Sequence, residues 1–522
     1  MHDTIDDLAN DYVAKLCELS PLFASETGLK DTGDLDDFSP EGAQAHADLR
    51  RKALAELEAL RPRGDSETVT KAAMIERLTA EQALHEAGED IGVINPISSP
   101  IQAIRDSFDL MDTSCEEGWQ LIEQRVAQIP QALASYRRAI AHRVACGPQI
   151  PARQVARLRA EIAAITHPTG TLDDLAARRE GLDVAKAKQA FAELSDVLAE
   201  VPTTTVDGVG PERYPAHLAY FLGAEVDIDE TFVWAEEELA RVIAEQEETV
   251  GKLYGPGVTV REAMDRLNRD PKRMIHGTDA LREWMQETAD DAMSGMLEHF
   301  DIPQRLQTIE AMVITPGTGG IYYTGPSQDF SRPGRMWWSV PEGVEHFNTW
   351  LEKTTVYHEG VPGHHLQIGL AIHLADQLND WRRFACFVSG HAEGWALYAE
   401  RLMAELGYLE DPGDYLGMLD SQRLRITRVL VDIGAHTRGW SYEQAWQMLT
   451  ENVAMDRNFL RFELDRYLGW PGQSPSYKIG QRLWENERTE ALGRGESLRE
   501  FHARALSLGT LGLDVLHEAL SR

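Results

Sequence analysis

Long stretches in which apolar residues recur every three or four positions constrain the fold of this chain more than any other feature. Near the start, Ile5, Leu8, Tyr12 and Val13 follow this spacing, which is typical of the buried face of a helix. Alanine, leucine, glutamate and arginine dominate residues 43–60, 66–88, 115–145, 150–200 and about 230–300, and helical patterns return from about residue 344. These residue types lose little conformational freedom in a helix. The sequence therefore predicts a mainly α-helical protein.

Breaks in this pattern suggest where helices and lobes begin. Ser39 is followed by Pro40, and this pair predicts a helix start with serine as the N-cap and proline as the first helical residue. A longer break covers residues 203–215 and contains a threonine run and several glycines. We place a lobe boundary there, which gives an N-terminal helical lobe of residues 1–210 and a second helical lobe of residues 211–522.

Residues 311–340 depart from the helical pattern. Three β-branched or aromatic triplets occur there: Met312-Val313-Ile314, Ile321-Tyr322-Tyr323 and Met336-Trp337-Trp338. The residues between them include Pro316-Gly317, Gly319-Gly320, Gly325-Pro326 and Pro333-Gly334, and such pairs are typical of turns. We expect a small antiparallel sheet in this region.

Charge and composition exclude several classes of protein. Lysine and arginine total 51 against 85 aspartates and glutamates, so the formal net charge is −34. Nucleic-acid binding and docking on anionic membranes both use basic surfaces, and we expect neither. The four cysteines show no C-x-x-C spacing, which argues against a disulfide framework or a cysteine-bound zinc. The acidic start does not resemble a secretory signal, and no run is long and apolar enough to span a membrane, so we expect a cytoplasmic protein.

The candidate metal-binding and catalytic residues lie in one short stretch, His358-Glu359-Gly360-Val361-Pro362-Gly363-His364-His365. In the H-E-x-x-H zinc signature two histidines four residues apart share a helix face, but here that position is Pro362. On a regular helix His358 and His364 would lie about 120° apart, and His365 would lie roughly 10 Å from His358. Glycine and proline disrupt regular helices. We therefore expect a bulge of two residues that returns His364 to the face of His358.

A zinc ion held by two histidines needs a third protein ligand and an open position. Glu393 follows His364 by 29 residues, in the first turn of a helix expected to begin near His391. We therefore predict His358, His364 and Glu393 as ligands of one Zn²⁺, with Mn²⁺ or Co²⁺ as alternatives. Glu400 lies two turns further along nearly the same face, where it would support a ligand or form a salt bridge.

HEGVPGHHLQ followed by EGWALYAE resembles a bacterial family, domain of unknown function 885. Further segments that fit the family are residues 20–28, 37–42, 322–323, 329–334, 428–436, 471–473 and 477–481, so the resemblance covers nearly the whole chain. That family is similar to zincin-like helical peptidases of the thimet-type oligopeptidase and Taq-type carboxypeptidase kinds. The resemblance implies a two-lobed helical body with a metal at the floor of a deep channel.

The resemblance also suggests further site residues. It places the metal ligands on His358, His364 and Glu393 and the general base on Glu359. Tyr477, three residues before Gly480, matches the tyrosine that stabilises the oxyanion in the related peptidases. The alternative for Tyr477 is simple packing on a helix. His436 would donate to substrate or oxyanion, or else be a hydrogen-bonded core residue.

Three basic residues, Arg332, Arg428 and Lys478, are candidates to hold a substrate carboxylate. The spacing does not choose among them, and each would serve equally well in a structural ion pair.

These observations predict a metal-dependent hydrolase. Zinc would lower the pKa of a bound water towards ~7, and Glu359 would take its proton as general base. The expected substrate is a short peptide, cleaved as by a carboxypeptidase, dipeptidase or oligopeptidase. Two alternatives stay open: an amidase acting on a modified amino acid or small acyl-amine, and a non-catalytic helical binding protein. The sequence leaves the oligomeric state open.

Overall fold

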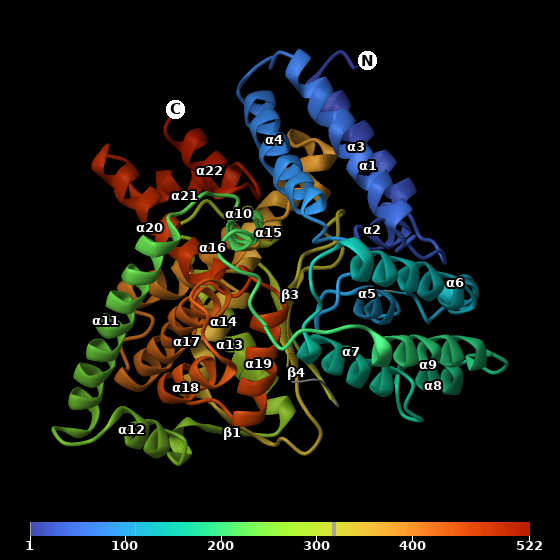
Figure 1. Cartoon of the computed structure of the whole chain (residues 1–522). Helices are drawn as coiled ribbons and strands as arrows, with labels where there is room; N and C mark the ends of the chain where they lie inside the picture. Colours follow the sequence, from blue (N-terminus) through green and yellow to red (C-terminus); the bar gives the residue numbers. More distant parts are fainter. Residues whose placement is uncertain (1, 110, 316–319) are drawn as a thin grey trace. The chain divides into compact units, whose positions relative to one another are not determined.

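The computed structural model describes residues 2–109, 111–315 and 320–522 (Figure 1). The chain forms two compact units. The first contains Met1–His217, Ala435–Tyr442 and Arg461–Pro471, and the second contains Leu218–Gly434, Glu443–Leu460 and Gly472–Arg522. These units are not the contiguous stretches 1–210 and 211–522 of the sequence prediction, because two late segments cluster with the N-terminal residues. The deep channel with a metal at its floor stays a prediction.

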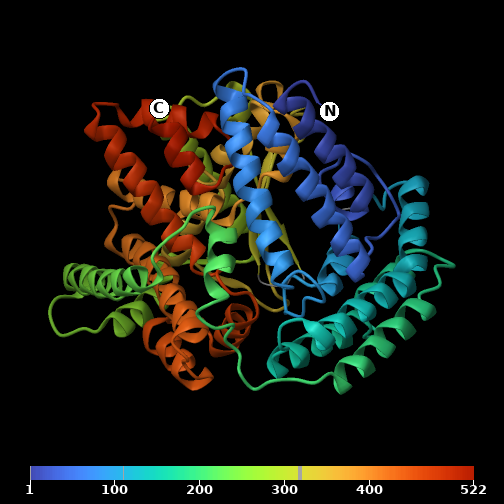
Figure 2. The ribbon, with the colours of Figure 1, turned by 45° about the horizontal axis from the view of Figure 1, so that its top comes forward.

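Helices make up most of the first unit. They are α1 (Ile5–Leu19), α2 (Pro21–Glu26), α3 (Pro40–Ala59), α4 (Asp65–Glu86), α5 (Pro100–Asp106), α6 (Glu116–Cys146), α7 (Ala152–Ile165), α8 (Thr171–Arg178) and α9 (Ala185–Glu200). Figures 1 and 2 show α1, α3 and α4 side by side, and α6 packs against α9. The predicted start of α3 is confirmed, because the Ser39 hydroxyl accepts a hydrogen bond from the N–H of Gly42 at 3.1 Å and Pro40 is the first helical residue.

The second unit is also mainly helical. It contains α11 (Ile228–Tyr254), α12 (Val260–Leu267), α13 (Thr278–Met296), α14 (Thr349–Glu359), α15 (His364–His373), α16 (Ser389–Glu405), α20 (Ser476–Gly493), α21 (Leu498–Ser507) and α22 (Leu513–Leu520). Four helices include residues of both units: α10 (Tyr214–Leu222), α17 (Pro412–Thr437), α18 (Tyr442–Asn452) and α19 (Arg457–Gly469). Short 3₁₀ segments lie at Pro271–Arg273, Gln304–Leu306 and Ala375–Gln377, and a π-helical turn at Trp381–Ala385. The mainly helical class is confirmed.

The predicted sheet is present, with one difference in its pairing. Strands β2 (Ile309–Ile314), β3 (Ile321–Thr324) and β4 (Gly334–Ser339) form a sheet in the order β2-β4-β3. The β3–β4 pair is antiparallel as predicted, whereas β2 runs parallel to β4. Of the predicted turn residues, 316–319 lie outside the described residues.

A second, two-stranded sheet was not predicted. Strand β1 (Met274–His276) pairs antiparallel with β5 (His346–Asn348), in regions where the sequence predicted helix. Each strand has only three residues, which is too short to leave a periodic pattern.

In the described part of the chain, no helix is both long enough and apolar enough to cross a membrane.

Candidate metal centre

The His-Glu segment breaks into two helices, which takes the place of the predicted bulge. Helix α14 ends at Glu359 and α15 begins at His364. The N–H of Gly363 donates to the carbonyl of Tyr357, six residues back, at 3.0 Å, which is a wider turn than the four-residue step of an α-helix. A Cβ at Gly363 would lie 1.9 Å from the carbonyl oxygen of His358, so only glycine fits this turn.

Helix α16 holds the turn in place. The indole N–H of Trp395 donates to the carbonyls of Pro362 at 2.9 Å and Gly363 at 3.1 Å. The first bond satisfies the carbonyl of Pro362, which the break leaves without a helical partner, and the second adds to the bond that the N–H of Gln367 makes to the carbonyl of Gly363 at 3.4 Å. They also fix the turn relative to α16, the helix that contains Glu393.

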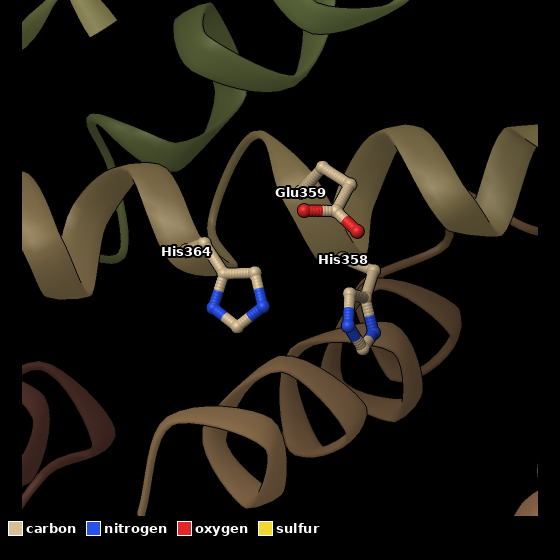
Figure 3. Close-up of side chains that lie close together, drawn as sticks. All are labelled: His358, Glu359 and His364. Carbon is tan, nitrogen blue, oxygen red and sulfur yellow. The ribbon is translucent and has the colours of Figure 1, made fainter. Parts of the chain in front are cut away.

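The break brings the predicted ligands together. The ring centroids of His358 and His364 are 5.0 Å apart, and Figure 3 shows both imidazoles on the same side of the broken helix. Oε2 of Glu393 lies 3.3 Å from Nε2 of His358 and 3.7 Å from Nε2 of His364. Glu359 also belongs to this cluster, because its carboxylate and the two imidazoles offer ligand atoms within 4.8 Å of one another. His358, Glu359 and His364 are all buried.

Glu400 fixes the orientation of the first histidine. Nδ1 of His358 donates to Oε1 of Glu400 at 2.8 Å, and Oε2 of Glu400 accepts from the hydroxyls of Thr354 at 2.8 Å and Ser421 at 3.0 Å. When His358 is neutral, its remaining proton lies on Nδ1, so the lone pair of Nε2 on the side of Glu393 is free to bind a metal ion. The suggested supporting role of Glu400 agrees with these contacts.

Opposite charges and burial shift the pKa values in this cluster. Burial opposes the protonation of His358, but Glu393 and Glu400 outweigh it and raise its pKa to about 10. Burial also opposes the ionisation of Glu393, but the two histidines and a hydrogen bond from Tyr477 hold its pKa at about 2. Burial lowers the pKa of His364 to about 4. Without a metal, the cluster therefore holds a proton on His358 and an ionised Glu393.

The donor set fits a divalent metal ion. Oε2 of Glu393 is buried and makes no well-aligned hydrogen bond, although it lies within ion-pair distance of His358. Two imidazole nitrogens lie within 3.7 Å of that same oxygen. Two histidines and one carboxylate are a typical ligand set of catalytic zinc, and the hydrogen bond from His358 to Glu400 is the kind of contact that orients a metal-bound histidine.

Burial also raises the pKa of the Glu359 carboxyl, to about 7. Glu393 and Glu400 add to this rise, and His358 opposes it. A general base works best when its pKa lies near the operating pH. The environment of Glu359 is therefore suited to taking up and releasing a proton.

Close contact between two helices brings Tyr477 to the cluster. A Cβ at Gly394 would lie 2.4 Å from the carbonyl carbon of Gly480, so α16 and α20 can approach this closely only through glycine. Tyr477, on the first turn of α20, donates a hydrogen bond to Glu393. The guanidinium of Arg428 lies over the Tyr477 ring, 5.0 Å from its centroid. The tyrosine predicted from resemblance thus contacts a predicted ligand.

The predicted carboxylate-binding residues Lys478 and Arg332 also have structural contacts. Nζ of Lys478 is buried and lies 3.0 Å from Glu238 and 2.6 Å from Gln422. Arg332 donates to the carbonyls of Gly325 at 2.7 Å and Pro333 at 3.1 Å, within its own loop. These contacts favour the structural alternative for both.

His436 belongs to the first unit, whereas the metal cluster belongs to the second. The N–H of Val209 donates to Nδ1 of His436 at 3.2 Å, and Nε2 lies 3.0 Å from the carbonyl of Tyr467. The ring also stacks on Tyr214 at 5.6 Å between centroids. These contacts are those of a hydrogen-bonded core histidine, and a catalytic role for His436 stays a prediction.

His365 contributes to the framework of the site. Tyr323 donates to its Nδ1 at 2.9 Å, and Nε2 donates to the carbonyl of Leu306 at 2.8 Å. Because Tyr323 lies on β3, His365 ties α15 to the small sheet. Its exclusion as a ligand by helix geometry agrees with these contacts.

The sequence analysis missed one residue near the cluster, Arg425 on α17. Ser421, Arg425 and Arg428 are spaced at i, i+4 and i+7 and therefore share one helix face. This spacing was a signal that the sequence already contained.

Fold and cluster together define a mainly helical protein with a cluster of two histidines and the carboxylates of Glu359 and Glu393. The chain belongs to a bacterial family, because the model of "Bacterial protein of unknown function (DUF885)" matches residues 21–520. This confirms the family inferred from the sequence motifs. The relation to zincin-like peptidases stays a prediction.

Two solved structures share the fold. One is of a protein of Colwellia psychrerythraea provisionally described as a lipoprotein, with 20% identity, a TM-score of 0.83, and coverage of 99% of this chain and 98% of the other. The other, from Shewanella oneidensis, is provisionally described as a lipoprotein of unknown function, with 17% identity, a TM-score of 0.76 and full coverage of both chains. No curated protein matches this chain.

Proposed function

We propose that the protein is a metal-dependent hydrolase that cleaves amide bonds of short peptides, with His358, His364 and Glu393 as the metal ligands. The observation that carries this proposal is the meeting of Nε2 of both histidines at one buried carboxylate oxygen of Glu393, at 3.3 and 3.7 Å. An ion at this point would satisfy all three atoms, and zinc suits the set best.

When bound, such an ion supplies Lewis-acid chemistry that makes a water acidic and polarises a carbonyl. Glu359 takes a proton from the attacking water and later gives it to the leaving amine. Its pKa, raised to about 7 by burial, allows both transfers near neutral pH. Tyr477 donates a hydrogen bond from its hydroxyl to the oxyanion that forms on the substrate. Its present hydrogen bond to Glu393 places that hydroxyl beside the ligand set.

The Glu359→Gln variant tests the proposal because it keeps the shape of the side chain and removes the base. We expect it to bind metal like the wild-type protein and to lose turnover, whereas His358→Ala should lose both. Elemental analysis of the untagged protein measures the metal. A panel of dipeptides compared with non-peptide amides measures turnover and separates a peptidase from an amidase. Full hydrolytic rate in Glu359→Gln would refute the base assignment. Wild-type protein without stoichiometric metal would favour a non-catalytic binding protein.

The cellular location is a separate matter. The sequence predicts a cytoplasmic protein, whereas the two similar structures are of proteins provisionally described as lipoproteins. These descriptions favour an extracytoplasmic alternative for this chain. Fractionation of the native cells into cytoplasm, periplasm and membranes decides between the two.

A further inference from the structure

One face of α17 lies along the metal cluster. The hydroxyl of Ser421 donates to Glu400 at 3.0 Å, and Arg428 lies over the ring of Tyr477. Residues four and seven positions apart on a helix face the same way. Arg425 stands between these two contacts on the same face, about one helical turn from each. Its guanidinium is therefore directed to the side of α17 that borders the cluster.

Arg425 has no bonded partner in the part of the chain that the structure describes. It takes part in no ion pair within 4.0 Å there, and its Nε is buried without a hydrogen-bond partner, while the residue as a whole stays partly exposed. The guanidinium therefore lies on the side of α17 that borders the cluster and is not engaged in a structural bond.

The other basic candidates differ in this respect. Lys478 is bonded to Glu238 and Gln422, and Arg332 to its own loop. Arg428 is stacked on Tyr477. A carboxylate that approached three glutamates without a cation would be repelled. Arg425 is the guanidinium best placed to offset that repulsion.

We propose that Arg425 binds the C-terminal carboxylate of the substrate, so that the enzyme releases residues from the free C-terminal end of short peptides. A guanidinium holds a carboxylate through two parallel hydrogen bonds, which gives direction as well as attraction. This inference rests on the proposed hydrolase function and deepens it: the substrate class is a peptide acid, cleaved as by a carboxypeptidase or dipeptidase.

The test compares zinc-loaded wild-type protein with Arg425→Met on a dipeptide panel in which each member is prepared as the free acid and as the C-terminal amide. We expect the wild-type protein to prefer the acids. In Arg425→Met, kcat/KM for the acids should fall about 10- to 100-fold, the range of a lost hydrogen bond to a charged group. For the amides it should change less than about twofold. A fall of equal size on acids and amides, or no fall, would overturn the inference.

Arg423→Met is the matched control. It removes the same charge from the opposite face of α17, where Arg423 donates to Gln246 and Asn452, each at 2.9 Å. Its ratio of acid to amide activity should equal that of the wild-type protein. Arg425→Lys is a second control, for misfolding. It keeps the charge and loses the two-pronged geometry of the guanidinium, so we expect an intermediate preference for acids. An unchanged melting temperature and zinc content would show that each variant is folded and loaded.

A binding measurement separates the two proposals. Calorimetry on Glu359→Gln should give tighter binding of the free-acid dipeptides than of the amides, and adding Arg425→Met should abolish that difference. If the wild-type protein hydrolyses no member of the panel, the hydrolase proposal fails. The calorimetry still tests whether Arg425 binds the C-terminal carboxylate. Equal dissociation constants for the acids with and without Arg425→Met would overturn the carboxylate assignment alone.

Discussion

The variant Glu400→Gln tests how strongly the hydrogen bond behind His358 controls metal binding. Glu400 is almost fully buried and accepts three hydrogen bonds, from His358, Thr354 and Ser421, at 2.8 to 3.0 Å. Glutamine has the same shape, and its amide oxygen can still accept from His358 while its NH₂ donates to the two hydroxyls. The substitution therefore removes the negative charge and leaves the hydrogen-bond pattern intact.

Loss of this charge makes His358 a weaker ligand. Mutation of groups that hold a metal-bound histidine lowers metal affinity about 10- to 100-fold, which corresponds to about 1.4–2.7 kcal/mol. Competition with a zinc chelator of known affinity measures the dissociation constant. Glu405→Gln is the control, because Glu405 lies on the same helix in an exposed pair with Arg488 and should leave the constant unchanged. A change of less than about twofold in Glu400→Gln would refute the reasoning.

Four further predictions follow from the same contacts. Because the pKa of His358 is about 10 without metal, zinc must displace one proton when it binds. The zinc affinity should therefore rise about tenfold per pH unit between pH 6 and 8. A zinc affinity that does not change with pH in the chelator titration would exclude His358 as a ligand. Gly363→Ala should abolish zinc binding, since its Cβ would lie 1.9 Å from the His358 carbonyl, whereas Gly493→Ala, with nothing within 4 Å, should not. Tyr477→Phe should lower kcat about 10²- to 10³-fold at unchanged zinc content, and an unchanged kcat would rule out the oxyanion role. His436→Ala should destabilise the fold by about 1–3 kcal/mol in urea titrations, and unaltered stability with lost turnover would instead support catalysis.

The fold was predictable where it depends on local sequence. The start of α3 at Ser39-Pro40 is one example, because capping involves only neighbouring residues. The antiparallel β3–β4 pair is another, since strands that follow each other closely across turn residues commonly pair as a hairpin. The parallel pairing of β2 with β4 is different: it depends on which of two later strands lies beside β2, and no local pattern encodes that choice.

The candidate site was likewise predictable only in those features that depend on local sequence. Ideal helix geometry was enough to reject His365 and to require a distortion between His358 and His364, because angles per residue are fixed. The form of the distortion was not predictable. It depends on Trp395, which holds the turn from another helix. Arg425 was missed for a similar reason: its spacing was visible, but only the contacts of its neighbours with Glu400 and Tyr477 show which way that face of α17 points.

The strongest alternative to catalysis is a structural metal site, in which Glu359 would be a fourth ligand. Structural zinc sites are closed by four protein ligands, whereas catalytic sites use three and keep one position open. The contacts of Glu393 favour the open arrangement, because its Oε2 lies near both imidazoles while the burial-raised pKa of Glu359 suits a group that exchanges protons. The two cases differ in one measurable quantity. Loss of a fourth ligand in Glu359→Gln would lower zinc affinity by orders of magnitude, whereas loss of a base would leave it unchanged and remove only the turnover.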